Sequence, residues 1–175
     1  MKKADRKIVT EFGEEYYGFS FGSVNDRVCE IVFNTSMVGY QEIVSDLSYT
    51  DQSVVMTYPL IGNYGITDDD FESRTPGIGA LIVHDYNDMP SNFRYTKTLS
   101  ELLEENGIPG ISGVDTRMIT RRIRDNGSCR VPAFRVLLIH LTWKPLALDG
   151  GNTVTAPVDE QTETVVFVPV GNSVL

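Results

Sequence analysis

Cysteine and histidine side chains are the first candidates for chemistry in this chain, because a thiol or hydroxyl nucleophile needs a base beside it. The chain has two of each, Cys29 and Cys129, and His84 and His140. Cys29 lies in a strand-like apolar stretch, which predicts a buried structural thiol, and Cys129 lacks the G-x-C-x-G turn that exposes a nucleophile. Both histidines lie in or directly after apolar runs, which is typical of a core or capping role. We therefore expect no catalytic residue in this chain.

Acidic side chains gather at residues 68–70 (DDD), with Glu72 close by, where a divalent cation could bind. The cluster lacks the alternating ligands and the distal glutamate of a calcium loop, which favours a solvated loop. Two cysteines in no metal-ligand spacing and two histidines are a poor set for a zinc site. The glycines form no phosphate loop, since the sequence Gly-Lys-Ser/Thr does not occur. We expect neither a metal site nor a cofactor site.

Three arginines, Arg117, Arg121 and Arg124, are spaced so that they share one face of a predicted helix. They form a basic stripe on an acidic protein. Two interpretations stay open. The stripe is either a solvated helix face or a docking surface for an acidic partner, since arginine is favoured at protein interfaces.

The chain that carries these residues has 175 residues, a net charge of −9 and 41% hydrophobic residues. This length suits one globular domain, with or without an appendage, and the apolar content suffices for an ordinary core. The acidic balance argues against binding to nucleic-acid phosphates. No apolar run has the length of a membrane helix, and no signal-peptide core follows the basic start. We expect a cytoplasmic protein with no nucleic-acid or membrane partner.

Apolar periodicity predicts short strands first and helices later. The expected strands are residues 16–21, 29–33, 53–58, 78–83 and 108–114, with a helical turn at 40–44. One helix begins after Thr98, whose spacing from Glu101 fits a capping box, and another runs from Asp115 to about residue 127. This order predicts an α/β domain with helices on one side of a sheet.

The chain changes character near residue 130, where charged residues become scarcer and valine, threonine and proline more frequent. We therefore expect a domain over residues 1–129 and a tail over residues 130–175. The tail has no helical period. Residues 136–139 and 165–168 are expected to be strands, and residues 148–164 a loop.

Four ordered motifs carry a resemblance to a known family. They are residues 33–42 (FNTSMVGYQE), 57–65 (TYPLIGNYG), 91–94 (SNFR) and 113–121 (GVDTRMITR). Together they resemble the N-terminal domain of the carbamoyl-phosphate synthase small subunit, and the resemblance covers residues 7–129. It implies a swivelling β/β/α layered domain.

The resemblance also implies a function. The small subunit of that family hydrolyses glutamine and passes ammonia to a large, ATP-using subunit, which makes carbamoyl phosphate for pyrimidine and arginine synthesis. The N-terminal domain is implied to dock on the large subunit, to which ATP and the metal ions belong. Residues 46–49 (DLSY) are similar to the family's D-P-S-Y segment, so Ser48 inherits a place beside the glutamine pocket.

The chain departs from the family pattern at two places. Leu47 replaces a proline that would have fixed φ, which predicts a looser loop around Ser48. No G-x-C-x-G and no H-x-E follow residue 129, so the Cys-His-Glu triad of the family's amidotransferase domain is absent from this sequence. We therefore expect no glutamine hydrolysis by the chain alone. The alternatives are a non-catalytic docking or regulatory module, and a truncated or frameshifted fragment.

Overall fold

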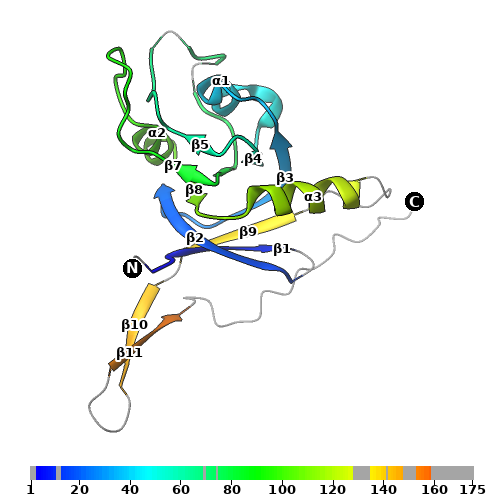
Figure 1. Cartoon of the computed structure of the whole chain (residues 1–175), viewed down its shortest axis with the longest axis vertical. Coiled ribbons are helices and arrows are strands. Elements are labelled where there is room, and N and C mark those ends of the chain that lie inside the picture. The colour runs from blue at the N-terminus through cyan, green and yellow to red at the C-terminus, as the bar shows by residue number, and fades with distance from the viewer. Residues whose placement is uncertain are drawn as a thin grey trace. The chain divides into compact units, whose positions relative to one another are not determined.

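Short apolar segments of the chain form the strands of a closed barrel in this computed structural model. The structure describes residues 3–10, 13–68, 70–73, 75–127, 135–140, 142–147 and 153–158. The barrel strands are β1 (Arg6–Thr10), β2 (Glu15–Gly22), β3 (Arg27–Asn34), β4 (Gln52–Met56), β6 (Ala80–Ile82), β8 (Pro109–Ser112) and β9 (Arg135–His140). Their order around the barrel is β1-β2-β8-β6-β4-β3-β9, and β9 closes onto β1 (Figure 1).

Neighbouring barrel strands run parallel in the pairs β3–β4, β4–β6 and β6–β8, and the remaining pairs are antiparallel. In register, Val54 of β4 lies opposite Val32 of β3 and Leu81 of β6. Parallel neighbours need a long crossover, which is commonly a helix. Helix α1 (Tyr40–Ser45) with the 3₁₀ turn η1 (Leu47–Tyr49) connects β3 to β4, and α2 (Leu99–Glu105) lies between β6 and β8.

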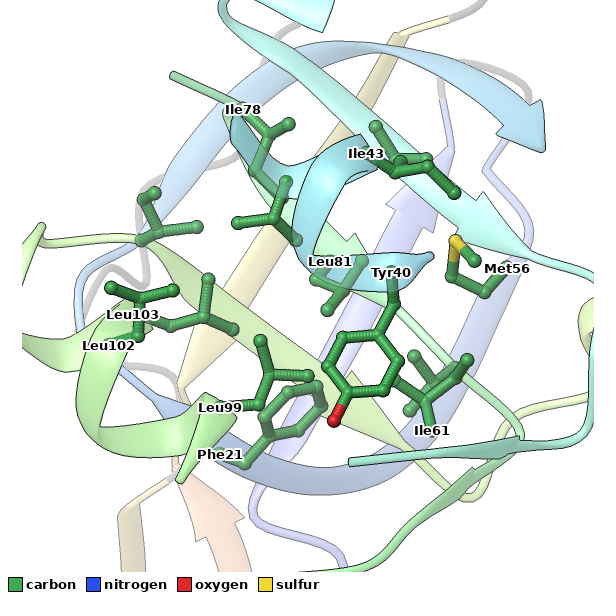
Figure 2. Packing of buried hydrophobic residues seen from close by; sticks show 14 of the residues in the cluster. Phe21, Tyr40, Ile43, Met56, Ile61, Ile78, Leu81, Leu99, Leu102 and Leu103 are labelled. Carbon is green, nitrogen blue, oxygen red and sulfur yellow. The ribbon is translucent and has the colours of Figure 1, made fainter. Parts of the chain in front are cut away.

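Buried residues divide into two apolar clusters. One, shown in Figure 2, packs Tyr40 and Ile43 of α1 together with Leu99 and Leu103 of α2 and with Leu81 of β6. The other takes a residue from each of β1, β3, β4, β6 and β8, namely Ile8, Ile31, Val55, Ile82 and Ile111. In a closed barrel the side chains of one sheet face point inward, where those of several strands meet, so we assign this second cluster to the barrel interior.

Helix α3 (Thr116–Gly127) packs on the barrel interior, through Ile119 and the partly buried Ile123. The helices therefore contact both faces of the sheet, rather than the one face expected. Two short strands, β5 (Leu60–Ile61) and β7 (Asp85–Tyr86), pair with each other in parallel outside the barrel.

The predicted capping box is confirmed. The Thr98 hydroxyl accepts a hydrogen bond from the Glu101 amide at 3.1 Å, and the Glu101 carboxylate accepts one from the Thr98 amide at 2.7 Å. The start of α3 is confirmed as well, since Asp115 Oδ1 accepts from the Met118 amide at 2.9 Å. Both helices thus begin where local side-chain chemistry satisfies their free N–H groups.

The chain separates into two compact units, Met1–His140 and Leu141–Leu175. In the second unit, β10 (Thr142–Ala147) pairs antiparallel with β11 (Thr153–Val158). The predicted strand at 136–139 is confirmed by β9, whereas the loop predicted over 148–164 is wrong at β11. The predicted strand at 165–168 lies outside the described residues.

The mixed α/β class is confirmed by these strands and helices. The swivelling β/β/α layering and the domain boundary at residue 129 stay predictions. Within the described part of the chain, no helix combines the length and the apolar character needed to cross a membrane.

Candidate functional site

Ser48 lies on η1, which follows α1 after a single extended residue. That residue, Asp46 (φ −73°, ψ 119°), ends α1 and caps η1, because its Oδ1 accepts a hydrogen bond from the Ser48 amide at 2.8 Å. The Ser48 side chain is exposed, and its hydroxyl makes no hydrogen bond within the described part of the chain. The fold therefore fixes the backbone of Ser48 and leaves a neutral donor and acceptor open to a ligand.

Leu47 occupies a position that would accept proline. Its side chain is 67% exposed, and no hydrogen bond from its amide is found among the described residues. Asp46 before it already has the extended ψ of 119° that a following proline demands. The first position of a helical turn tolerates proline, because its N–H has no intrahelical partner.

We therefore expect Leu47→Pro to raise the free energy of unfolding by about 0.4–1 kcal/mol, because proline restricts the unfolded chain more than the folded one. Urea-induced unfolding measures this gain. Leu47→Ala is the control and should give none of it. A proline variant less stable than the alanine variant would mean that the backbone at Leu47 is not preset as described.

A cleft of about 290 Å³ lies beside η1. Its lining contains the carboxylates of Glu42, Asp46 and Glu72, together with the amide of Asn34 and the ring of Tyr49. The Asn34 side chain donates a hydrogen bond to the Tyr49 hydroxyl at 3.1 Å, which ties the end of β3 to η1. Carboxylates favour cationic groups, so this cleft suits a small ligand that carries an ammonium group.

Tyr64 holds the start of α1 in place. Its hydroxyl accepts hydrogen bonds from the amides of Gly39 and Tyr40, at 3.0 and 3.1 Å. The Tyr40 ring stacks on Tyr64 with centroids 4.2 Å apart, and the Tyr40 hydroxyl donates to the Gly65 carbonyl at 2.8 Å. Burial raises the pKa of both phenols. Because both stay protonated, they act as structural hydrogen-bonding groups and not as bases.

Gln41 adds a second tie between the same two segments. Its fully buried side chain accepts a hydrogen bond from the Thr67 amide at 2.9 Å and donates one to the Thr67 carbonyl at 2.5 Å. We call Tyr40, Gln41, Tyr64 and Thr67 the motif frame. It joins the motif at 33–42 to the segment that begins with the motif at 57–65, and α1, which leads into η1, rests on it.

The acidic segment at residues 68–70 is engaged in local hydrogen bonds. Asp70 accepts from the Thr67 hydroxyl at 2.6 Å, and Asp68 accepts from the Thr96 hydroxyl at 3.3 Å. Asp69 lies outside the described residues. These contacts agree with the solvated loop favoured from the sequence.

The three arginines Arg117, Arg121 and Arg124 are exposed on α3, and no ion pair involves them within the described part of the chain. Arg122 differs, because it pairs with Glu14 at 2.8 Å. The structure does not bring the arginines together with Ser48. Helix α1 packs in the first apolar cluster, with Leu99 and Leu103 of α2, whereas α3 packs on the barrel interior.

Cys29 is a buried free thiol, as predicted, and burial raises its pKa. Its thiolate is therefore disfavoured, which makes it a poor nucleophile. His84 is exposed, and its Nδ1 lies 3.0 Å from the Val114 carbonyl. Cys129 and the His140 side chain lie outside the described structure.

The motif frame was missed by sequence reasoning, which treated the motifs as signatures of a family and not as partners of one another. The only sequence signal for the motif frame was that the chain contains both Gly-Tyr-Gln, in the first motif, and Ile-Gly-Asn-Tyr-Gly, in the second. The described residues thus define a class of protein, a mixed α/β domain in which a largely buried motif frame holds α1 in front of the exposed Ser48, with an arginine face on α3.

A family model described as "Carbamoyl-phosphate synthase small chain, CPSase domain" matches residues 8–132, and the chain belongs to this family. It is 56% identical over 125 residues to the carbamoyl phosphate synthase small chain of Staphylococcus epidermidis, covering 71% of this chain and 34% of the relative. It is 54% identical over 123 residues to that of Fusobacterium nucleatum, covering 70% and 34%. The pyrimidine-specific small chain of Bacillus subtilis is 51% identical over 125 residues, covering 71% and 34%.

The predicted resemblance is thus confirmed, and the chain spans about a third of the length of these relatives. Among solved structures, an aminopeptidase from Aneurinibacillus sp. strain AM-1 overlaps with a TM-score of 0.40 at 15% identity, covering 79% of this chain and 30% of that one. An overlap that low carries no functional information.

Proposed function

We propose that this chain is the N-terminal domain of the small subunit of a glutamine-dependent carbamoyl-phosphate synthase, which docks on the ATP-using large subunit and supports the glutamine site. The observation that carries the proposal is the family match over residues 8–132. In the proposed reaction, glutamine, bicarbonate and ATP give carbamoyl phosphate for pyrimidine and arginine synthesis in the cytoplasm. ATP and metal ions belong to the large subunit, and this chain holds no cofactor.

The finer fold assignment belongs to the same proposal. Residues 1–129 would form the family's swivelling β/β/α layered domain, and residues 130–175 a tail whose first strand, β9, pairs with β1 and β3 of the barrel. The end of the family match at residue 132 supports a boundary close to that point.

Ser48 is the residue that we propose to contact glutamine. Its exposed hydroxyl has no internal partner among the described residues, and the side chain of Asp46 fixes its amide. The carboxylates of the neighbouring cleft suit the α-ammonium group of an amino acid. Ser48 would therefore orient the substrate and take no part as a nucleophile.

The arginine stripe of Arg117, Arg121 and Arg124 is the surface that we propose for docking on the large subunit. All three guanidinium groups are exposed on a helix whose inner face is anchored by Ile119, so the stripe is free to meet carboxylates of a partner.

We expect Arg121→Glu to weaken binding to the cognate large subunit about tenfold, because a favourable charge pair becomes a repulsive one. Affinity is measured by titration calorimetry, alongside thermal melting. Arg122→Glu is the matched control on the same helix. It should shift the melt, because Arg122 pairs with Glu14 inside the domain, and should leave affinity unchanged. Unchanged affinity and melt for Arg121→Glu would mean that the stripe is a solvated face.

The isolated chain is expected to release no ammonia from glutamine above background, because neither Cys29 nor Cys129 has the sequence of a nucleophile turn. On this account the chain alone is a non-catalytic docking module. A coupled assay for ammonia measures this directly. Release above background that Cys29→Ala or Cys129→Ala abolishes would contradict the expectation.

A further inference from the structure

The last strand of the barrel, β9, lies outside the part of the chain that matches the family. The match ends at residue 132, whereas β9 spans Arg135–His140. The strand nevertheless belongs to the same compact unit as the rest of the barrel, which extends from Met1 to His140. Figure 1 shows β9, in yellow, alongside β1. The barrel is therefore closed by a segment beyond the matched residues.

Main-chain pairing holds β9 on both sides. It pairs antiparallel with residues 6–10 of β1 and with residues 27–30 of β3. Among the described residues, β1 and β3 each pair with β9 and not with each other. Without β9, both would present an edge of unpaired N–H and C=O groups, which is a template for an added strand. We call the gap between these two edges the β1–β3 slot.

The interior side of the β1–β3 slot sets what an added strand must offer. Ile8 of β1 is fully buried and Cys29 of β3 is 5% exposed. Their register partners on β9 are Leu138 and Val136, respectively. Side chains alternate between the two faces of a strand, so the slot requires apolar residues at every second position. The main-chain bonds themselves are open to any residue except proline.

We propose that the β1–β3 slot is a peptide-binding site, that its ligand is an extended segment with apolar residues at alternate positions, and that β9 occupies it as an intramolecular ligand. The inference does not rest on the proposed function, because it concerns how the barrel is completed. It explains how a segment outside the family match closes the barrel, since main-chain pairing and alternation are sufficient. The same segment offered as a separate peptide should then fill the slot.

The test begins with the full chain carrying Leu138→Pro. Leu138 lies opposite Ile8 of β1 and Arg27 of β3, and a proline in a strand flanked on both sides removes a ladder hydrogen bond. We expect thermal melting of this variant at least about 5 °C below the unaltered chain. Val154→Pro is the matched control, because it places a proline in β11 of the separate two-stranded sheet, and it should leave the melt of the barrel unchanged.

A synthetic peptide of residues 134–141, extended by lysines for solubility, is then titrated into the Leu138→Pro chain. We expect saturable binding and a melt that rises with peptide concentration, because a ligand of the folded state stabilises it by mass action. A peptide in which Val136 and Leu138 exchange places keeps the alternation and should act in the same way. A peptide that carries Leu138→Pro should do neither.

An unchanged melt for the Leu138→Pro chain would overturn the inference, because β9 would not be needed to close the barrel. A lowered melt that the unaltered peptide does not recover would overturn it as well, since the slot would then form only with its covalent strand. Equal recovery by the proline peptide would reveal unspecific apolar binding and contradict it. If the Leu138→Pro chain does not fold alone, it is refolded from urea with the peptide: folding supports the inference and no folding overturns it.

Discussion

Gly62→Ala is expected to lower the free energy of unfolding by about 2–5 kcal/mol. Gly62 has a φ of +94°, and a Cβ there would lie 2.3 Å from the Asn87 carbonyl oxygen and 2.7 Å from the Tyr86 ring. The positive φ costs a residue with a Cβ about 1–2 kcal/mol, and overpacking adds about 1–3 kcal/mol. The backbone cannot retreat, because the Asn87 amide donates to the Ile61 carbonyl at 2.9 Å between β5 and β7.

Gly13→Ala separates the two causes. Gly13 also has a positive φ, +79°, but a Cβ there would meet no atom of the described residues within 4 Å. We expect it to cost only the conformational part, about 1–2 kcal/mol. Urea-induced unfolding of both variants gives the comparison. Equal losses at Gly62 and Gly13 would show that the close approach of Asn87 is unimportant.

Gln41→Leu is the second large effect that we expect, a loss of about 2–5 kcal/mol in the free energy of unfolding. Leucine has a similar volume, but it leaves both the amide and the carbonyl of Thr67 without their partner. Thr67 is only 8% exposed, so water cannot fully replace Gln41. An orphaned buried polar group costs about 1–3 kcal/mol, and here there are two of them.

Glu42→Leu is the matched control, because it makes a change of similar size at the next position of α1. The Glu42 side chain is partly exposed and makes no hydrogen bond within the described structure, so the expected change is within about 0.5 kcal/mol. If Gln41→Leu were as mild as Glu42→Leu, the motif frame would contribute little to the fold.

Local sequence signals predicted the helices well. Thr98 with Glu101, and Asp115, mark helix starts by side-chain hydrogen bonds to amides three residues further on, and the structure has both bonds. Strands were harder to predict. The strand β1 was missed because its buried residues include Arg6 and Lys7, which read as a polar start, and its pairing with β9 joins residues far apart in sequence.

In the candidate site, too, local features could be predicted from the sequence and long-range contacts could not. Ser48 could be named from its motif, and the arginine face followed from helical spacing. The bonds of Tyr64 to Gly39 and of Gln41 to Thr67 could not be predicted, because each spans 25 or 26 residues and depends on where the loop after β5 returns. The sequence also gave no sign of how far Phe93 stands out from the surface, since exposure is set by the tertiary fold.

We propose that this chain docks on the large subunit of a carbamoyl-phosphate synthase. Calorimetric titration of the purified cognate large subunit with the unaltered chain tests it most directly. We expect a saturable one-to-one complex with a dissociation constant on the order of 10 μM or tighter, which corresponds to a binding free energy of about 7 kcal/mol or more. No saturable binding with the chain present at roughly tenfold above that concentration would contradict it.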